Sequence, residues 1–76
     1  MVFEKIREII ASNLEIDPKT ITLETNINED LKADSLDLFK IVNDIEDEFN
    51  IKIEYAETVE TVEDAVNYVK EQTKEG

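Results

Sequence analysis

The stretch ADSLDLFKIVNDIEDEF, residues 33–49, decides the fold because it carries the clearest helical pattern in the chain. Its apolar side chains recur three and four residues apart, so they share one face of an α-helix while the charged ones lie elsewhere. That apolar stripe consists of Leu38, Ile41, Val42, Ile45 and Phe49. Asp34 has the character of an N-cap, and Asp37 follows three residues later. The sequence therefore predicts a helix that begins at Ser35 and ends at Phe49.

Two further stretches, one on each side, show amphipathic spacing. Apolar side chains recur at helical intervals from Val2 to Leu14, and the Asp-Pro pair at 17–18 ends that pattern because the residue before a proline avoids helical geometry. Towards the other end of the chain, Thr61 and Asp64 have the spacing of a capping box. We therefore expect one helix over residues 2–14 and another that follows Thr61.

The segments between these helices differ in length and in pattern. Residues 16–34 show no sustained helical period, and we expect an ordered loop there, pinned by Ile21, Leu23, Ile27 and Leu31. Residues 51–60 start with strand-like alternation and then have the composition of a short helix. The sequence thus predicts an all-α fold, a small four-helix bundle with a long first loop and a short third helix, in a single domain over residues 1–76.

Composition removes several classes of chemistry. The chain has 76 residues, of which 41% are hydrophobic, enough for one modest core. It contains no cysteine and no histidine, which excludes disulfides, thiolate or imidazole zinc sites and a histidine general base. The first residues lack the pattern of a signal peptide, and no apolar run is long enough to span a bilayer. We therefore expect a soluble protein with no membrane insertion, cytoplasmic or, after processing, inside an organelle.

Acidic residues dominate the charge of the chain. The net charge is −12 at pH 7, and residues 29–64 hold thirteen acids against three lysines. Such a surface repels nucleic acid, so no nucleic acid partner is expected, and it is suited to steering basic proteins into brief encounters. Excess charge also serves solubility alone in many small proteins, and that interpretation stays open.

Two other functions would depend on the acidic side chains. Paired carboxylates could serve an enzyme, but on a charged helix they usually form a solvated face. A calcium loop is the sharper alternative, because Asn26, Asn28, Asp30 and Asp37 fall at EF-hand spacing. Leu31, however, replaces the glycine of the turn, and Asp37 is shorter than the usual bidentate glutamate. We predict no dedicated metal site and keep an acidic, calcium-responsive interaction protein as the alternative from a different class.

Ser35 is one of only two serines, and it falls in the first turn of the predicted helix. One interpretation is a small residue that helps to start the helix. The other depends on the helix dipole and the free N–H groups of a first turn, which favour a nearby phosphate. A serine without a base but with such a site suits the covalent attachment of a phosphate-linked group by another enzyme.

Residues 29–54, EDLKADSLDLFKIVNDIEDEFNIKIE, resemble the signature region of acyl carrier proteins, in which Asp-Ser-Leu opens the second helix. The resemblance extends over nearly the whole chain, to the final TVEDAVNYV at 61–69. It implies an acyl-carrier bundle in which Ser35 bears 4'-phosphopantetheine through a phosphodiester, taken from coenzyme A by a phosphopantetheinyl transferase. The protein would then be a carrier and not an enzyme. Growing fatty acyl chains would be held as thioesters on the arm and delivered to the enzymes of fatty acid biosynthesis.

The same helix offers a candidate docking surface. Leu36 and Phe39 lie three residues apart on a side that faces away from the apolar stripe, although ordinary core packing is the alternative for both. The acids expected to surround them are Asp34, Asp37, Asp44, Glu46 and Asp47. These acids would speed encounter with basic docking patches, and the apolar pair would supply short-range fit. We expect the carrier to act as a monomer.

Some positions depart from the commonest pattern of the family. Lys32 stands where a glycine often precedes Ala-Asp-Ser-Leu, which suggests a less strained loop at that point. Asn43 and Lys40 replace a frequent methionine and a common acid. These departures bear on the choice of partner, so a specialised carrier for a polyketide or other secondary pathway is the alternative within the carrier class.

Overall fold

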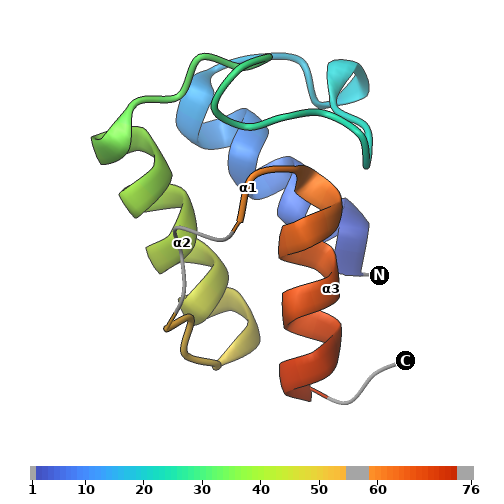
Figure 1. Ribbon diagram of the computed structural model, residues 1–76, viewed down its shortest axis with the longest axis vertical. Coiled ribbons are helices and arrows are strands. Elements are labelled where there is room, and N and C mark those ends of the chain that lie inside the picture. Colours follow the sequence, from blue (N-terminus) through green and yellow to red (C-terminus); the bar gives the residue numbers. More distant parts are fainter. Residues whose placement is uncertain (1, 55–58, 74–76) are drawn as a thin grey trace.

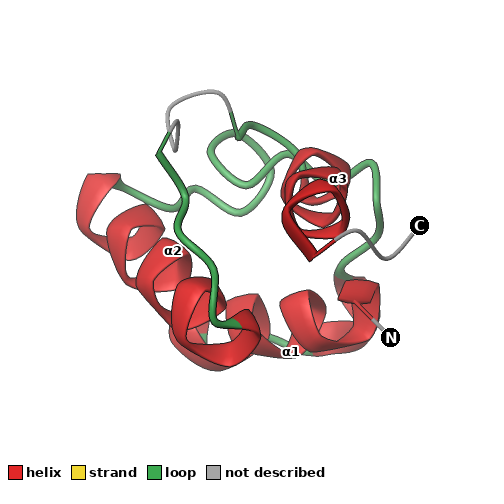
Figure 2. Cartoon of the chain, turned by 90° about the horizontal axis from the view of Figure 1, so that it is seen from below, coloured by secondary structure: helices red, strands yellow, loops and turns green. Residues whose placement is uncertain are grey.

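The computed structural model describes residues 2–54 and 59–73, and in these ranges the chain is helical with connecting loops (Figure 1). It contains α1 (Val2–Leu14), the 3₁₀ turn η1 (Pro18–Thr20), α2 (Ser35–Phe49) and α3 (Val62–Thr73). Seen from below, α1 runs along the lower edge of the view and packs against both α2 and α3 (Figure 2). The all-α prediction is confirmed, and the limits of the first two long helices are those predicted. The expected short third helix falls on residues 55–58, outside the described part of the chain.

One apolar cluster joins the three helices and the first loop. Its buried members include Ile6 and Ile10 from α1, Ile41 and Ile45 from α2, and Val69 from α3. Burial of each such side chain contributes about 1.5–3 kcal/mol, so the amphipathic stripes account for most of the drive to fold. The predicted stripe of α2 lies as expected, with its two end members, Leu38 and Phe49, packed at the edge of the cluster.

The helices end where the sequence supplies a local reason. The chain leaves α1 at Glu15, which has a left-handed backbone, and the Ile16 N–H donates to the Ala11 carbonyl at 3.1 Å. Asn50 adopts the same left-handed conformation after α2, with φ of 54°, as asparagine commonly does at a helix C-terminus. Asp17 begins η1 by accepting a hydrogen bond from the Lys19 N–H at 2.9 Å.

The long first loop is held against the start of α3 by backbone hydrogen bonds. The Ile27 N–H donates to the Glu60 carbonyl at 2.8 Å, and the Val62 N–H donates to the Thr25 carbonyl at 3.0 Å. Ile21 and Ile27 are buried, and Leu31 packs against the core, as predicted. Leu23 is the exception, because its side chain remains 39% exposed and so does not pin the loop. Its carbonyl does so instead, by accepting the Glu63 N–H at 2.9 Å.

None of the helices in the described ranges is both long and apolar enough to cross a membrane.

Candidate functional site

Ser35 is the first residue of α2, and its side chain is exposed. The helix begins there because Asp34 and Asp37 form the predicted capping box. The Asp37 N–H donates to Asp34 Oδ1 at 2.9 Å, and the Asp34 N–H donates to Asp37 Oδ2 at 3.4 Å. Together these bonds hold the serine in a fixed first turn at the surface.

The loop that leads to Ser35 is tied back to the body of the protein. Ala33 is buried, and its N–H donates to the Ile27 carbonyl at 3.3 Å. Lys32, just before it, has φ of 53°, in the left-handed region that favours glycine. The expectation of a less strained loop at Lys32 is therefore wrong, because the backbone keeps a conformation that costs a lysine about 1 kcal/mol.

The first turn of α2 suits a phosphate and lacks the parts of a nucleophilic catalyst. The N–H groups of Ser35 and Leu36 have no intrahelical acceptor, and the dipole favours negative charge at this end. Asp34 and Asp37 each use one carboxylate oxygen in the capping bonds, and the chain has no histidine to act as a base. The residues present therefore fit the covalent attachment of a phosphate-linked group carried out by a second protein.

Leu36 and Phe39 form an exposed apolar pair one turn into α2. Their side chains are 72% and 64% exposed, which rules out core packing for both. Asp47, further along α2, is exposed as well. Exposed large apolar side chains that carry no packing role commonly mark a contact site for another protein.

Four of the acids expected around this pair have structural roles in addition to their charge, and Asp34 is the N-cap described above. Asp37 serves the capping box, and Asp44 Oδ2 accepts a hydrogen bond from the Asn13 side chain of α1 at 2.8 Å. Glu46 is half-buried, and its Oε2 accepts the Ile53 N–H at 2.7 Å, which ties the segment after α2 to the helix. The acids of α2 are therefore unequal, because Glu46 and Asp44 also position neighbouring elements.

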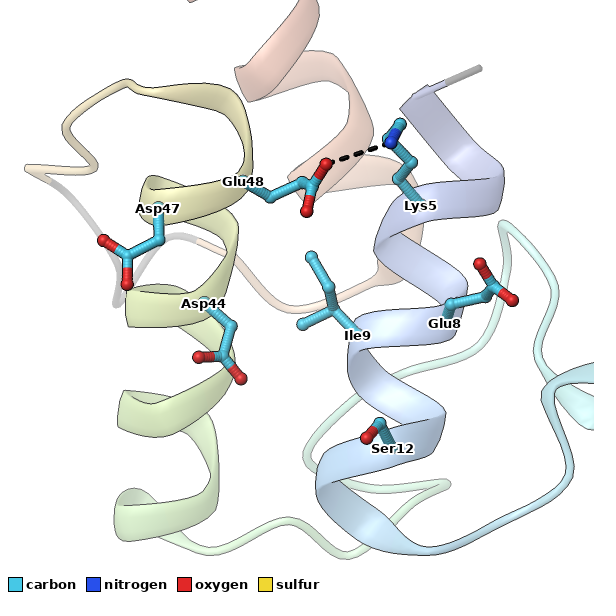
Figure 3. Close-up of a pocket in the computed structure, with 7 residues that line it drawn as sticks. All are labelled: Lys5, Glu8, Ile9, Ser12, Asp44, Asp47 and Glu48. Atoms are coloured by element: carbon cyan, nitrogen blue, oxygen red, sulfur yellow. Dashed lines mark hydrogen bonds and ion pairs between the residues drawn. The ribbon is translucent and has the colours of Figure 1, made fainter.

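A groove of about 450 Å³ runs between α1 and α2 (Figure 3). Lys5 Nζ and Glu48 Oε2 lie 2.9 Å apart across one end of it, and Ile9 lies in the groove beside them. The hydrogen bond and the charge of Glu48 raise the pKa of Lys5 above its usual value. Sequence reasoning missed this pair, because the two residues are 43 positions apart and nothing local links them.

The residues with EF-hand spacing do not assemble a calcium loop. Asn26 Oδ1 accepts the N–H groups of Asn28 and Glu29 at 2.9 and 2.8 Å, and Asp30 Oδ2 accepts the Asn26 N–H at 2.8 Å. Asp37 belongs to the capping box of α2. These oxygens hold the loop backbone, and within residues 2–54 and 59–73 no group of three acidic side chains is placed to hold a metal ion.

An exposed serine beside the unbonded N–H groups of a helix N-terminus, in a small helical protein with an acidic surface, is the arrangement of a carrier domain. The family model described as a phosphopantetheine attachment site matches residues 4–69. An acyl carrier protein from Streptococcus thermophilus is 51% identical over 96% of this chain and 97% of its own length. One from Lactococcus lactis is 49% identical over 91% and 93% of the two chains. A solved structure of an acyl carrier protein from Enterococcus faecalis has a TM-score of 0.80 and 37% identity, and covers 93% of this chain and 92% of that one.

The chain belongs to the acyl carrier protein family. Its prosthetic group is 4'-phosphopantetheine, which the family binds covalently, and acyl chains are carried on that arm. The thiol of the arm supplies the sulfur that the cysteine-free chain lacks.

Proposed function

We propose that Ser35 is the attachment point of the arm, and that the loaded protein delivers acyl chains to the enzymes of fatty acid biosynthesis. The observation that carries this proposal is the exposed hydroxyl of Ser35 at the start of a capped helix whose first N–H groups are open. Ser12, the other serine, lies within α1, where the N–H groups are used by the helix itself.

Attachment requires a second protein because this chain offers no base for the serine proton. In the reaction, Ser35 Oγ forms a bond to the phosphorus that carries pantetheine. The pyrophosphate bond of coenzyme A breaks, and the nucleotide half leaves with the second phosphate. The serine proton passes to a base on the phosphopantetheinyl transferase, since this chain has no histidine and the neighbouring Asp34 and Asp37 serve the cap. After attachment, the phosphodiester lies beside the first N–H groups of α2.

Recognition by the transferase and by the synthesis enzymes uses the α2 surface in this proposal. Leu36 and Phe39 form the apolar contact, and Asp34, Asp37, Asp44, Glu46 and Asp47 supply the negative field that attracts basic docking patches. The field acts at a distance and raises the encounter rate, while the apolar pair acts only on contact. This division suits a carrier that must bind many enzymes briefly.

Residues 1–76 act as one carrier domain and as a monomer in this proposal. A shared apolar cluster joins all three described helices, which supports a single folding unit. A net charge of −12 opposes the approach of a second copy, which supports the monomer. The cytoplasmic location stays a prediction.

The test of the attachment site is the intact mass of the protein after incubation with coenzyme A, magnesium and a phosphopantetheinyl transferase. We expect wild type and Ser12→Ala to gain one arm and Ser35→Ala to gain none. Circular dichroism of the three proteins should agree, because both serines are exposed. Loading of Ser35→Ala, or an unmodified wild type beside a positive control carrier, would overturn the proposal.

A further inference from the structure

A second groove lies away from Ser35, where the N-terminal half of α1 meets the first loop and the start of α3. It has a volume of about 700 Å³, and its lining includes Phe3, Arg7, Lys19, Ile21, Leu23 and Glu63. Figure 1 shows the first turns of α1 and the loop after η1 on the opposite side of the molecule from the start of α2. The surface is therefore separate from the docking surface described above.

Arg7 supplies a hydrogen-bond donor in this groove that the described protein leaves unused. It is the only arginine in the chain, and its guanidinium carbon lies 5.1 Å from the centre of the Phe3 ring. The Nε atom is buried and has no hydrogen-bond acceptor among the described residues. A buried donor without a partner is uncommon in folded proteins. Because Nε is covered by protein atoms, an incoming carboxylate would meet the outer N–H groups of the guanidinium, which form no ion pair among the described residues and whose fork matches carboxylate geometry.

Leu23 supplies the apolar part of the groove. Apart from Leu36 and Phe39, it is the one large apolar side chain that is exposed in the described ranges. Its backbone is fixed, since its carbonyl accepts the Glu63 N–H at 2.9 Å. The half-buried Phe3 lines the same groove, so an apolar side chain that entered would meet Phe3 and Leu23 together. A rigid apolar contact loses little conformational entropy on binding.

The charges that line this groove indicate what it would bind. Arg7 and Lys19 are balanced by Glu24 and Glu63, whereas the α2 surface is almost entirely acidic. An acidic protein segment would therefore meet less repulsion here than at the α2 surface. A simple anionic amphiphile would place its single charged end close to two carboxylates, while a peptide can also offer hydrogen-bond donors to them. The balance favours a peptide over a lipid.

We propose that the groove formed by Phe3, Arg7, Lys19 and Leu23 is a second docking surface, for a protein segment that presents an acidic side chain beside a large apolar one. The carboxylate pairs with the Arg7 guanidinium, and the apolar side chain packs on Leu23 and Phe3. Because the groove is on the other side of the molecule, a protein bound there leaves Ser35 and α2 accessible to the enzymes that exchange acyl chains. This proposal does not depend on Ser35 being the attachment site. Either proposal can therefore fail while the other holds.

The probe is a displayed library of random short peptides, selected on the phosphopantetheine-loaded protein and counter-selected on the Arg7→Gln variant. We expect the selected peptides to share an acidic residue next to a large apolar one. Their affinity should fall at least about tenfold with Arg7→Gln and with Leu23→Asn. In wild type and Leu23→Asn, a peptide should bind more tightly with its acidic residue than with glutamine in that place, and in Arg7→Gln this difference in affinity should disappear. Arg7→Lys should restore part of the affinity, because the charge returns without the fork.

The sole arginine also gives a direct readout of the contact. Its Nε–H signal in a proton–nitrogen correlation spectrum should shift on addition of a selected peptide, while the amide signals of Leu36 and Phe39 stay in place. Leu36→Asn is the matched control, since it removes an exposed leucine from the other surface and should leave binding unchanged. The proposal is overturned if no peptide survives counter-selection, or if the surviving peptides bind Leu23→Asn and wild type equally well. It is also overturned if dodecanoate, a simple anionic amphiphile, shifts the Arg7 signal and the peptides do not.

Discussion

The N-termini of α2 and α3 begin with the same kind of cap, yet they differ in what remains open. At α2, Asp34 and Asp37 exchange hydrogen bonds, and the N–H groups of Ser35 and Leu36 have no acceptor among the described residues. At α3, the Thr61 hydroxyl accepts the Asp64 N–H at 3.2 Å, and Asp64 Oδ2 accepts the N–H groups of Thr61 and Glu60 at 3.1 and 3.2 Å. There the next two N–H groups, of Val62 and Glu63, are taken by the carbonyls of the first loop.

The difference shows how one local motif serves either structure or function. A cap whose remaining donors bind another part of the chain joins two segments. At α3 these segments are residues 23–27 and 60–63, whose contact we call the seam, and it includes the isolated bridge between Asn26 and Thr61. A cap whose remaining donors are free makes a site for an anion. We therefore expect changes at the α3 cap to cost stability and changes at the start of α2 to cost activity.

The largest effect on stability should come from Asp64→Ala. The substitution removes the acceptor of two backbone N–H groups at the seam, and we expect the free energy of unfolding to fall by about 1–2 kcal/mol. Asp37→Ala is the matched change in the other cap, where one longer bond of 3.4 Å is lost, and it should cost about 0.5–1 kcal/mol. Urea unfolding of both variants makes the comparison. Equal losses would mean that the seam adds nothing to the cap of α3.

Phe39→Ala should change binding and leave folding intact. The ring is 64% exposed, so the free energy of unfolding should stay within about 0.5 kcal/mol of wild type. Affinity for a phosphopantetheinyl transferase, measured by calorimetry, should fall about tenfold, equivalent to about 1.4 kcal/mol. Leu23→Ala is the control, because it shortens an exposed apolar side chain on the opposite side. Transferase binding that is weakened equally by both changes would argue against a docking surface on α2.

Acid should weaken the α3 cap before it disrupts the helices. Hydrogen bonds from the backbone N–H groups of Thr61 and Glu60 hold the pKa of Asp64 below its ordinary value of 3.8. The stabilisation is therefore complete above 3.8 and is lost as the pH falls through the lower pKa of the folded state. The difference in unfolding free energy between wild type and Asp64→Ala, measured over this acid range, should shrink as the pH falls. A difference that stays constant would show that the charge of Asp64 contributes nothing.

Lys32→Gly should give the smallest effect, and in the opposite direction. Lys32 has a left-handed backbone, so a glycine relieves about 1 kcal/mol of strain but loses more entropy on folding. We expect the free energy of unfolding, measured by thermal or urea unfolding, to rise by about 0.5 kcal/mol. Lys40→Gly, within the exposed part of α2, should instead cost about 1 kcal/mol. Destabilisation by both glycines would show that the lysine conformation carries no strain.

Much of this fold follows from patterns within one or two turns of chain. Spacing of apolar residues placed α1 and α2, and the residue types at Asp34, Asp37, Thr61 and Asp64 indicated both caps before the tertiary structure was considered. The expectation that the Leu23 side chain pins the loop is wrong, because an apolar residue in an irregular segment gives no sign of which way it faces. The expectation of a less strained loop at Lys32 is wrong because the residue type does not reveal the backbone angle that accompanies the hydrogen bond from Ala33 to Ile27.

The sequence by itself determined the helices, their caps, the acidic surface and the position of Ser35 at a helix start. These features depend on contacts between residues three or four apart, which any chain with this pattern will make. Only the tertiary structure decided which capped helix keeps its N–H groups free, that Lys5 pairs with Glu48, and that Arg7 and Leu23 share a groove. These contacts are between residues far apart in the chain. They depend on the packing of the apolar core, because that packing fixes which backbone groups and side chains meet.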